Sequence, residues 1–404
     1  MKKLAINIIL MLSTSLLWAQ EYVPEGVSQL TSSYVNSARN RGLMVAVIDG
    51  DQIQYYGFGE LAKGSNQVPN KNTVFEIGEL SSLFTTTLLS DLVLNNEVHL
   101  DDRLQDFLTD TIKVPTFQNI ICTTRPAAWY DYDDQNAYEP AIIRTACGPD
   151  PNTPPTCITL CNLASHSAAL PELPKGLKRK GNNPFAGYEM STMLSRLEKL
   201  DLKQRPGEYY KRSDFGIALL GEALSHQQGM DFEALAIKRL FTPLDMQDTR
   251  ITLNAAQLDR LAKAHNKKGK VVDYWSYGAL APAGGFRSTA KDLARFVQAN
   301  MGATKTSLEF AFDATHQSWL TVEGKGADKT DMTLGWFIKS PNTKASKIWL
   351  SGSTGGFSSF IGFLKHEKKG IIILSNSSNS VAELGQDLLA WLKNYTTVTE
   401  ISQN

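Results

Sequence analysis

The stretch VFEIGELSSLFTTTLLS, residues 74–90, decides the fold of this chain of 404 residues. From Leu80 onward its apolar residues recur at the spacing of one helix face, which predicts a helix that begins just after Gly78. Glu79 then lies in the first turn, where unpaired backbone N–H groups and the helix dipole favour a negative charge. On these grounds alone, Glu79 needs no role beyond starting the helix.

The residues that follow suggest a second role for Glu79. VFEIG, the helix pattern FTTTLLSDLV and then HLDDRLQDFL resemble the segment around the Ser-x-x-Lys motif of serine β-lactamases and penicillin-binding proteins, particularly their class C β-lactamase and esterase branch. In that family the Ser is the nucleophile and the Lys lies one helical turn later. An alignment without gaps puts Glu79 at the nucleophile position and Ser82 at the lysine position.

Later segments extend this resemblance from about residue 25 to about residue 393. They are residues 158–174, 205–224, 240–253, 281–296 and 351–363. The resemblance implies an α+β fold, in which an antiparallel sheet flanked by helices carries a mostly helical inserted region. We expect the sheet part to comprise about residues 22–75 and 316–395, and the helical part about residues 76–315.

Two further motifs of the family are altered in this chain. The Tyr-x-Asn motif corresponds to Arg212-Ser213-Asp214. The strand motif Lys/His-Thr-Gly corresponds to a stretch that begins with Ser where the family has Lys or His, and that keeps Thr and Gly. The ligand-binding residues that this resemblance implies are Ser353, Thr354, Gly355 and Gly356.

The resemblance also implies an oxyanion hole built from main-chain amides. Its donors would be the N–H groups of Glu79 and Gly356, and backbone donors do not depend on the side chain at position 79. A pocket that binds polar groups is therefore expected to survive. The alternative is a glycine turn that is kept only for the fold.

Acyl transfer in this family requires a hydroxyl nucleophile and an adjacent base. A carboxylate at position 79 would give a labile mixed anhydride, and neither Ser82 nor Arg212 replaces the lost bases. We therefore expect no catalytic residue at the degenerate positions Glu79, Ser82, Arg212 and Asp214, and we predict a serine hydrolase-like pseudoenzyme. Because the family brings these positions together, Arg212 is predicted to pair with Glu79, with Asp214 or with both.

An active hydrolase of the β-lactamase, D-alanyl-D-alanine carboxypeptidase and esterase group remains the alternative. In that case Glu79 and Asp214 would act as a carboxylate pair, or Ser82 would serve as a new nucleophile. The new charges at these positions also have a simpler explanation, which is uncorrelated loss of an old site.

Composition and the N-terminus bear on partners and location. The 41 basic and 41 acidic residues balance, so no charge pattern typical of nucleic-acid binding is present. Residues 1–19 read as a signal peptide that leaves a mature chain of 20–404 without a membrane span, exported to the periplasm or secreted. We expect no cofactor and no metal. The expected partner is a peptidoglycan-derived or other small polar ligand, or an envelope protein, and the oligomeric state is left open.

An insert at about residues 116–157 departs from the family pattern. Four cysteines lie in or beside it, which in an exported chain predicts two disulfides of unspecified connectivity. They are Cys122, Cys147, Cys157 and Cys161. A metal site is the rival, but the spacing contains no Cys-x-x-Cys pair. The aromatic and acidic residues 129–134 form either a recognition surface or a solvated loop packed by its own rings.

Overall fold

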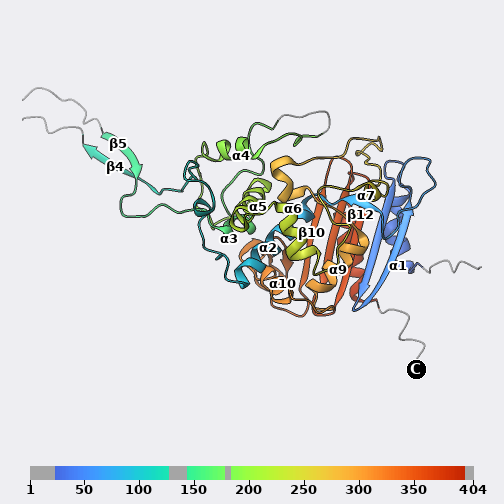
Figure 1. Ribbon diagram of the computed structural model, residues 1–404. Helices are drawn as coiled ribbons and strands as arrows, with labels where there is room; N and C mark the ends of the chain where they lie inside the picture. Colours follow the sequence, from blue (N-terminus) through green and yellow to red (C-terminus); the bar gives the residue numbers. More distant parts are fainter. Residues whose placement is uncertain (1–22, 127–142, 178–182, 396–404) are drawn as a thin grey trace, which may run out of the picture.

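The computed structural model describes residues 23–126, 143–177 and 183–395. The predicted signal peptide and the aromatic cluster at residues 129–134 lie outside these ranges. In the ranges that are described, no helix combines the length and the apolar character needed to cross a membrane. Figure 1 shows a sheet on one side of the molecule and a group of helices on the other.

The sheet has eight strands in the order β2-β1-β12-β11-β10-β9-β8-β7, and every neighbouring pair is antiparallel. The strands are β1 (Gly42–Asp49), β2 (Gln52–Gly59), β7 (Leu320–Glu323), β8 (Thr330–Met332), β9 (Phe337–Lys339), β10 (Lys347–Ser353), β11 (Ser358–Leu364) and β12 (Lys369–Ser375). β1 thus pairs with β12 from the far end of the chain, and β2 lies at the sheet edge beside β1. The predicted α+β class with an antiparallel sheet is confirmed.

Strand β1 shows why the sheet lies in the middle of the fold. Its side chains alternate between two hydrophobic clusters, with Val45 and Val47 in one and Ala46 and Ile48 in the other. Alternate side chains of a strand point to opposite faces of a sheet, so both faces of β1 are covered. Strands β1 and β2 form a hairpin, with Gly50 at a φ of +61° in its turn.

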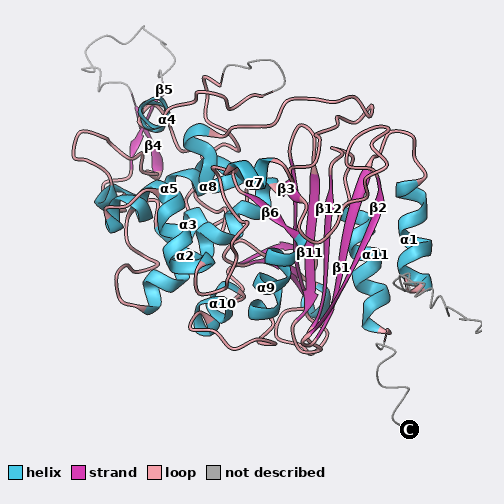
Figure 2. Cartoon of the chain, turned by 45° about the vertical axis from the view of Figure 1, so that its right-hand side comes forward, coloured by secondary structure: helices cyan, strands magenta, loops and turns pink. Residues whose placement is uncertain are grey.

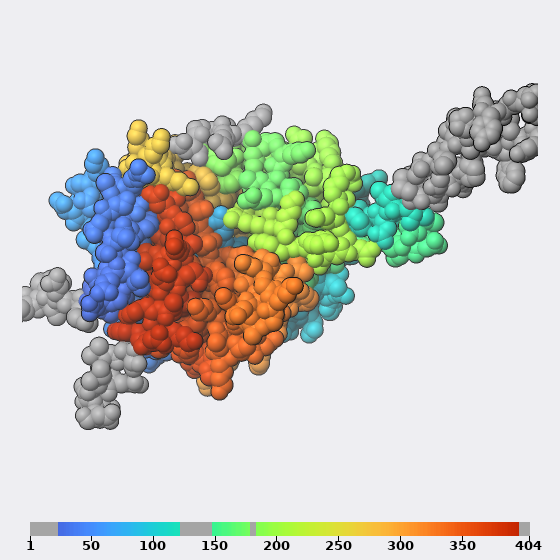
Figure 3. Space-filling view, turned by 180° about the vertical axis from the view of Figure 1, so that it is seen from behind, coloured from blue at the N-terminus to red at the C-terminus, as the bar shows by residue number. Residues whose placement is uncertain are grey.

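The two ends of the described chain cover one face of the sheet together. Helices α1 (Glu25–Val35) and α11 (Ala382–Lys393) lie side by side there, as Figure 2 shows. In the space-filling view of Figure 3, the N-terminal and C-terminal segments likewise adjoin on one surface. The N-terminal and C-terminal segments of the described chain therefore meet on the same face of the sheet.

The helical region packs against the other face. Its helices are α2 (Ser81–Leu94), α3 (Leu160–Ala164), α4 (Met190–Leu197), α5 (Asp214–Gln228), α6 (Phe232–Ala236), α7 (Ala255–Leu258), α8 (Ala281–Gly284), α9 (Ala290–Asn300) and α10 (Glu309–Thr315). A small separate sheet of β3 (Val74–Glu76) and β6 (Arg287–Thr289) joins the start of this region to its later part.

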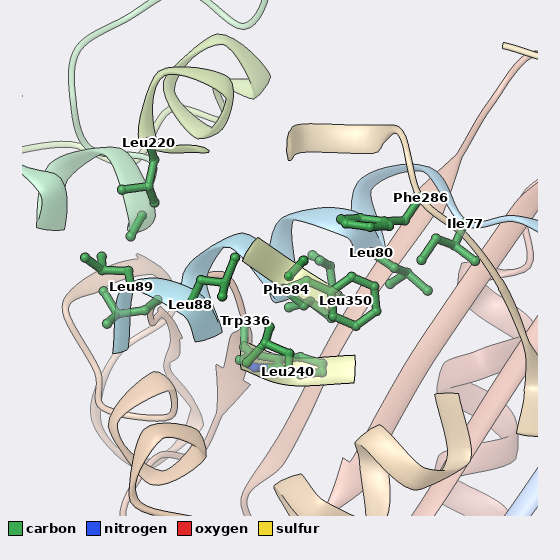
Figure 4. Packing of buried hydrophobic residues seen from close by; sticks show 14 of the residues in the cluster. Ile77, Leu80, Phe84, Leu88, Leu89, Leu220, Leu240, Phe286, Trp336 and Leu350 are labelled. Carbon is green, nitrogen blue, oxygen red and sulfur yellow. The ribbon is translucent and has the colours of Figure 1, made fainter. Parts of the chain in front are cut away.

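Helix α2 occurs where the sequence predicts it, but it is not the one-sided helix that the apolar spacing indicates. Residues 81–92 are all buried, because other helices surround it. The Thr85 hydroxyl donates a hydrogen bond to Pro282 O at 2.7 Å, and the Thr87 hydroxyl donates one to Leu83 O at 2.6 Å. Figure 4 shows Phe84 of this helix close to Phe286, and the two rings meet edge to face at 5.4 Å.

The insert forms an antiparallel pair, β4 (Ile120–Pro126) and β5 (Ile143–Pro149), which projects from the helical region in Figure 1. Its base is held by Phe117, whose main chain exchanges hydrogen bonds of 2.9 and 2.8 Å with Thr156. In the ladder Cys122 lies directly opposite Cys147.

The prediction that all four cysteines form disulfides is wrong for the other two, because Cys157 and Cys161 are free. The chain turns from an extended segment into α3 between them, with Thr159 as the helix cap. Cys161 is bound to Ser165, and burial raises the pKa of its thiol to about 11. Cys157 lies beside Arg103 instead.

Candidate functional site

The site begins at the turn that precedes α2. Residues Gly78–Leu80 form a single 3₁₀ turn, η1, which lies against strand β10. Glu79 projects from it, and its side chain is 18% exposed. One carboxylate oxygen, Oε1, accepts a hydrogen bond from Arg212 Nη2 at 2.6 Å. The other, Oε2, accepts one from the main-chain N–H of Ser353 at the end of β10.

Arg212 bonds to two carboxylates, as the charge pattern predicts. Besides Glu79, it reaches Asp214, with Nε at 3.2 Å from Oδ1 and Nη2 at 3.2 Å from Oδ2. Asp214 is the first residue of α5, and Ser213 caps that helix by accepting from Gly216 N–H at 2.9 Å. This cap fixes the backbone of Ser213 at the start of α5, and with it the positions of Arg212 and Asp214 on either side.

His166 holds the loop that carries Arg212 through two hydrogen bonds. Its carbonyl accepts from Lys211 N–H at 2.8 Å, and its Nδ1 accepts from Ser213 N–H at 3.1 Å. Because Nδ1 is an acceptor, the neutral ring carries its hydrogen on Nε2. Burial and the nearby Arg212 charge lower the pKa of His166 to about 4. A neutral histidine with its Nδ1 engaged positions the loop and does not replace the missing base.

The cluster carries two anions and one cation. Burial raises the pKa of Asp214 from 3.8 to about 6, while Arg212 opposes this rise and Glu79 adds to it. For Arg212, burial acts against the charge, but Glu79 and then Asp214 raise its pKa above its usual value. A guanidinium in this setting stays protonated and cannot accept a proton.

Ser82, the candidate nucleophile of the alternative enzyme hypothesis, is engaged by the main chain. Its hydroxyl donates to Glu79 O at 2.7 Å, and the residue is 4% exposed. The hydroxyl of Ser81 in turn accepts from Phe286 N–H at 3.1 Å. Tyr277, a buried neighbour, is no base either, because burial and then Glu79 raise its pKa well above 10.

The strand amide that meets residue 79 is not the one that the sequence predicts. Gly356 N–H turns to Thr354 Oγ1 at 3.3 Å, and a Cβ on Gly356 would clash with Ala264. The amide that meets the Glu79 carboxylate belongs to Ser353. The stretch 351–356 is one continuous run of small residues, and only the packing of β10 against η1 shows which of its amides faces residue 79.

Glu79, Arg212 and Ser353 open onto a polar pocket of about 380 Å³, whose lining does not include Asp214 or Ser82. Its lining combines the predicted residues Glu79, Arg212, Ser353, Thr354 and Gly355 with Ser351, Gly352 and Ser358 of the neighbouring strands and with Lys267, Ser378 and Ser380. Sequence reasoning did not single out these last six residues, and Lys267, Ser378 and Ser380 lie in loops whose composition carries no signal of a site. Gly356 is not part of the lining.

The chemical capacity of the site follows from this inventory. It offers main-chain and guanidinium donors, several hydroxyls and a carboxylate that is already paired. Among the residues that the structure describes, no cluster of His, Cys, Asp and Glu has the arrangement to hold a metal ion. The arrangement is suited to holding a polar, negatively charged group by hydrogen bonds.

Comparisons with known proteins agree with the fold. A family model described as Beta-lactamase matches residues 27–394. A beta-lactamase of Pseudomonas fluorescens is 27% identical over 375 residues, which cover 85% of this chain and 90% of the relative. The D-alanyl-D-alanine-carboxypeptidase/endopeptidase AmpH of Escherichia coli (strain K12) is 25% identical over 372 residues, covering 88% of this chain and 85% of the relative. The solved structure of a class C beta-lactamase matches with a TM-score of 0.72 at 22% identity, covering 92% of this chain and 96% of that one.

Proposed function

The chain belongs to the beta-lactamase family, and we propose that in this member non-covalent binding has replaced acyl transfer, so that it acts as a binding or regulatory module of the cell envelope. The observation that carries the proposal is the state of the Glu79 carboxylate. It is bound by Arg212 at 2.6 Å and by Ser353 N–H. A carboxylate held by two donors fills the place where an attacking hydroxyl would be needed.

The alternative of rebuilt chemistry has less support. A carboxylate pair needs one member that gives or takes a proton at the reacting atom. Here Arg212 lies between Glu79 and Asp214, so that Glu79 Oε1 and Asp214 Oδ2 both bind the same guanidinium. Ser82 donates to a carbonyl, and none of the described residues that could act as a base is hydrogen-bonded to its hydroxyl. Asp214, whose pKa is raised to about 6, has both carboxylate oxygens bound to Arg212, which opposes its use as a proton acceptor.

The proposed ligand is small and polar. The pocket holds about 380 Å³ and is lined by hydroxyls and by the cations Arg212 and Lys267. The names of relatives include a D-alanyl-D-alanine carboxypeptidase, so peptidoglycan-derived fragments are the first class to test. An envelope protein is the second possible partner.

The test of the lost acyl chemistry uses intact-protein mass spectrometry. The purified mature chain is incubated with a penicillin and with a fluorophosphonate, and nitrocefin hydrolysis is followed in parallel, with Escherichia coli AmpH as the control for the reagents. We expect no adduct and no hydrolysis above buffer. An adduct that maps to residues 79–82, or turnover of nitrocefin, would establish the enzyme alternative.

Binding is tested separately, by thermal denaturation with D-Ala-D-Ala peptides and with muropeptides. A ligand that binds only the folded state raises the melting temperature in proportion to the logarithm of its concentration. We expect such a rise for the chain, and a loss of it when Lys267 is replaced by Met. No shift with any fragment would leave the envelope-protein partner as the proposal to pursue.

The location in the envelope follows from the predicted signal peptide. We infer that residues 1–19 are removed on export. N-terminal sequencing of the protein from the envelope fraction should begin close to residue 20. A chain that retains Met1 in the cytoplasm would contradict this.

One disulfide remains part of the proposal. Cys122 and Cys147 face each other in the β4–β5 ladder, and export would place them in an oxidising compartment. We expect non-reducing mass spectrometry of the exported protein to show one bridge, with Cys157 and Cys161 open to alkylation after unfolding. Alkylation of all four thiols would contradict the bridge.

A further inference from the structure

The donors around Glu79 form a recognition unit for a carboxylate. Arg212 Nη2 reaches Oε1 at 2.6 Å, Ser353 N–H reaches Oε2, and Ser353 Oγ lies 3.5 Å from Oε1. A guanidinium together with a main-chain amide is a common donor set for carboxylates, and both bonds are charge-assisted. What is unusual is that the bound carboxylate belongs to the chain itself.

Two glycines allow the main chain to present this amide. Gly78 has a φ of +53°, and a Cβ there would clash with the Ser353 backbone. A Cβ on Gly352 would likewise clash with Ile77 O. Only glycine permits the turn η1 and strand β10 to approach this closely. The approach is what brings the Ser353 amide to position 79, so the donor belongs to the backbone of the fold and survives changes at residue 79.

The surroundings favour an anion beyond Glu79. Arg212 is 40% exposed and faces the same pocket as Lys267. If the Glu79 carboxylate leaves, Asp214 is the one ionic partner of Arg212 that remains among the described residues, and the Ser353 amide loses its acceptor. A buried or half-buried donor without a partner is unfavourable, so the vacated position should take up another acceptor of the same charge.

We propose that the pocket is a carboxylate-binding site that Glu79 occupies in cis, and that a carboxylate-bearing ligand gains Arg212 and the Ser353 amide only by displacing Glu79. The inference rests on the proposed non-covalent function and names the ligand class of that site. An attached group competes at a high effective concentration. The native chain should therefore bind simple carboxylates weakly, and a chain without the Glu79 carboxylate should bind them better.

The test replaces Glu79 with Ala, which removes a carboxymethyl group, and supplies acetate as the missing piece. Melting temperature is measured against acetate concentration, with chloride keeping the ionic strength constant. Two recovered charge-assisted hydrogen bonds predict that acetate binds E79A at least about tenfold more tightly than the native chain. The amide resonance of Ser353 in a ¹⁵N-labelled sample should shift with the same titration.

Two controls separate this site from a general effect of acetate. Glu208 also pairs with an arginine, Arg205, at 3.5 Å on the surface, so E208A removes a matched carboxylate elsewhere and should respond to acetate as the native chain does. The double variant E79A/R212M lacks the guanidinium donor and should lose the tenfold gain.

The outcome is decisive even where a variant folds poorly. If E79A is partly unfolded, acetate should restore its folded fraction, and E79S provides a second chain with the same two donors. A response of E79A and E79S no greater than that of the native chain would overturn the inference. That result is distinct from failure of the proposed function, which would appear as a covalent adduct on the native chain.

Discussion

Two glutamates three residues apart, Glu76 and Glu79, each bind an arginine, yet they have different surroundings. Glu76 is 3% exposed and its partner Arg287 14%, whereas Glu79 is 18% exposed and Arg212 40%. Glu76 accepts from Trp275 N–H at 2.8 Å and from Arg287 at 3.2 Å. The first pair fixes backbone inside the fold, and the second faces a pocket.

The same kind of ion pair therefore has a different role when it is buried than when it is partly exposed. Arg287 also donates to Trp275 O at 2.6 Å, so the Glu76 pair anchors the loop that carries Trp275. The ring of Trp275 fills the space beside Gly355, where a Cβ would clash with it. The buried pair thus supports the backbone beside Gly355 in the pocket lining, and Glu79 and Arg212 are themselves part of that lining.

The largest expected effect is at the buried pair. Replacing Arg287 with Met leaves the Glu76 charge uncompensated in the interior and should lower the free energy of unfolding by ~3–5 kcal/mol. Urea denaturation measures the loss. The matched control is Arg103→Met, which breaks an exposed pair with Asp106 and should leave the urea midpoint close to that of the native chain. A native-like midpoint for R287M would remove the contrast between the two glutamates.

A smaller effect is expected at the pocket pair. A double-mutant cycle with Glu79→Gln and Arg212→Met should give a coupling of ~1–2 kcal/mol, above the ~0.2–1 kcal/mol of exposed pairs but below that of buried ones. Solvent screening lowers the value, because Arg212 is 40% exposed. Coupling near zero would mean that the charges at positions 79 and 212 are energetically unrelated.

The titratable groups around Arg212 should also make the stability of the fold depend on pH. The pKa of Asp214 is raised to about 6, so its protonation favours the folded state, and this contribution grows as pH falls through about 6. The pKa of His166 is lowered from 6.5 to about 4, so the unfolded chain takes up that proton first and stability is lost as pH falls across this window. In the native chain the two contributions oppose each other.

Asp214→Asn removes the first contribution and leaves the second. Relative to the native chain, D214N should therefore lose stability as pH is lowered from about 7 to about 4. Unfolding free energies of both proteins across this range provide the measurement. Parallel curves would show that Asp214 does not titrate in this window.

The smallest effect concerns salt. At ~1 M NaCl the screening length falls to ~3 Å, which weakens exposed charge pairs much more than buried ones. The coupling of Glu79 with Arg212 should therefore decrease in high salt, while that of Glu76 with Arg287, measured with E76Q and R287M, should persist. Equal salt sensitivity of the two couplings would place both pairs in the same environment.

Local patterns predicted much of this fold. The continuous apolar run at 43–48 indicates a buried strand, and the structure has β1 there. The apolar spacing after Gly78 predicted α2, although the period could not show that helices enclose it on every side. Burial from all directions depends on packing partners that are distant in sequence, such as Phe286.

The candidate site could likewise be predicted only in part from the sequence. The substitutions at positions 79, 82, 212 and 214 are visible in the sequence, and they already exclude the hydroxyl and the bases of the family reaction. The disulfide prediction failed for Cys157 and Cys161, because proximity in sequence does not determine thiol direction across a helix start.

The sequence by itself determined the fold class, the family and the residue types at the positions of the family's acyl site, because these depend on local periodicity and on the order of motifs along the chain. Only the tertiary structure decided which strand amide meets Glu79. Ser353 and Gly356 both lie in a run of small residues, but the register of β10 with β11 makes Ser353 the last residue of β10, facing η1, and leaves Gly356 in the turn that follows, against Ala264. A register is set by pairing between distant segments, so a local pattern cannot specify it.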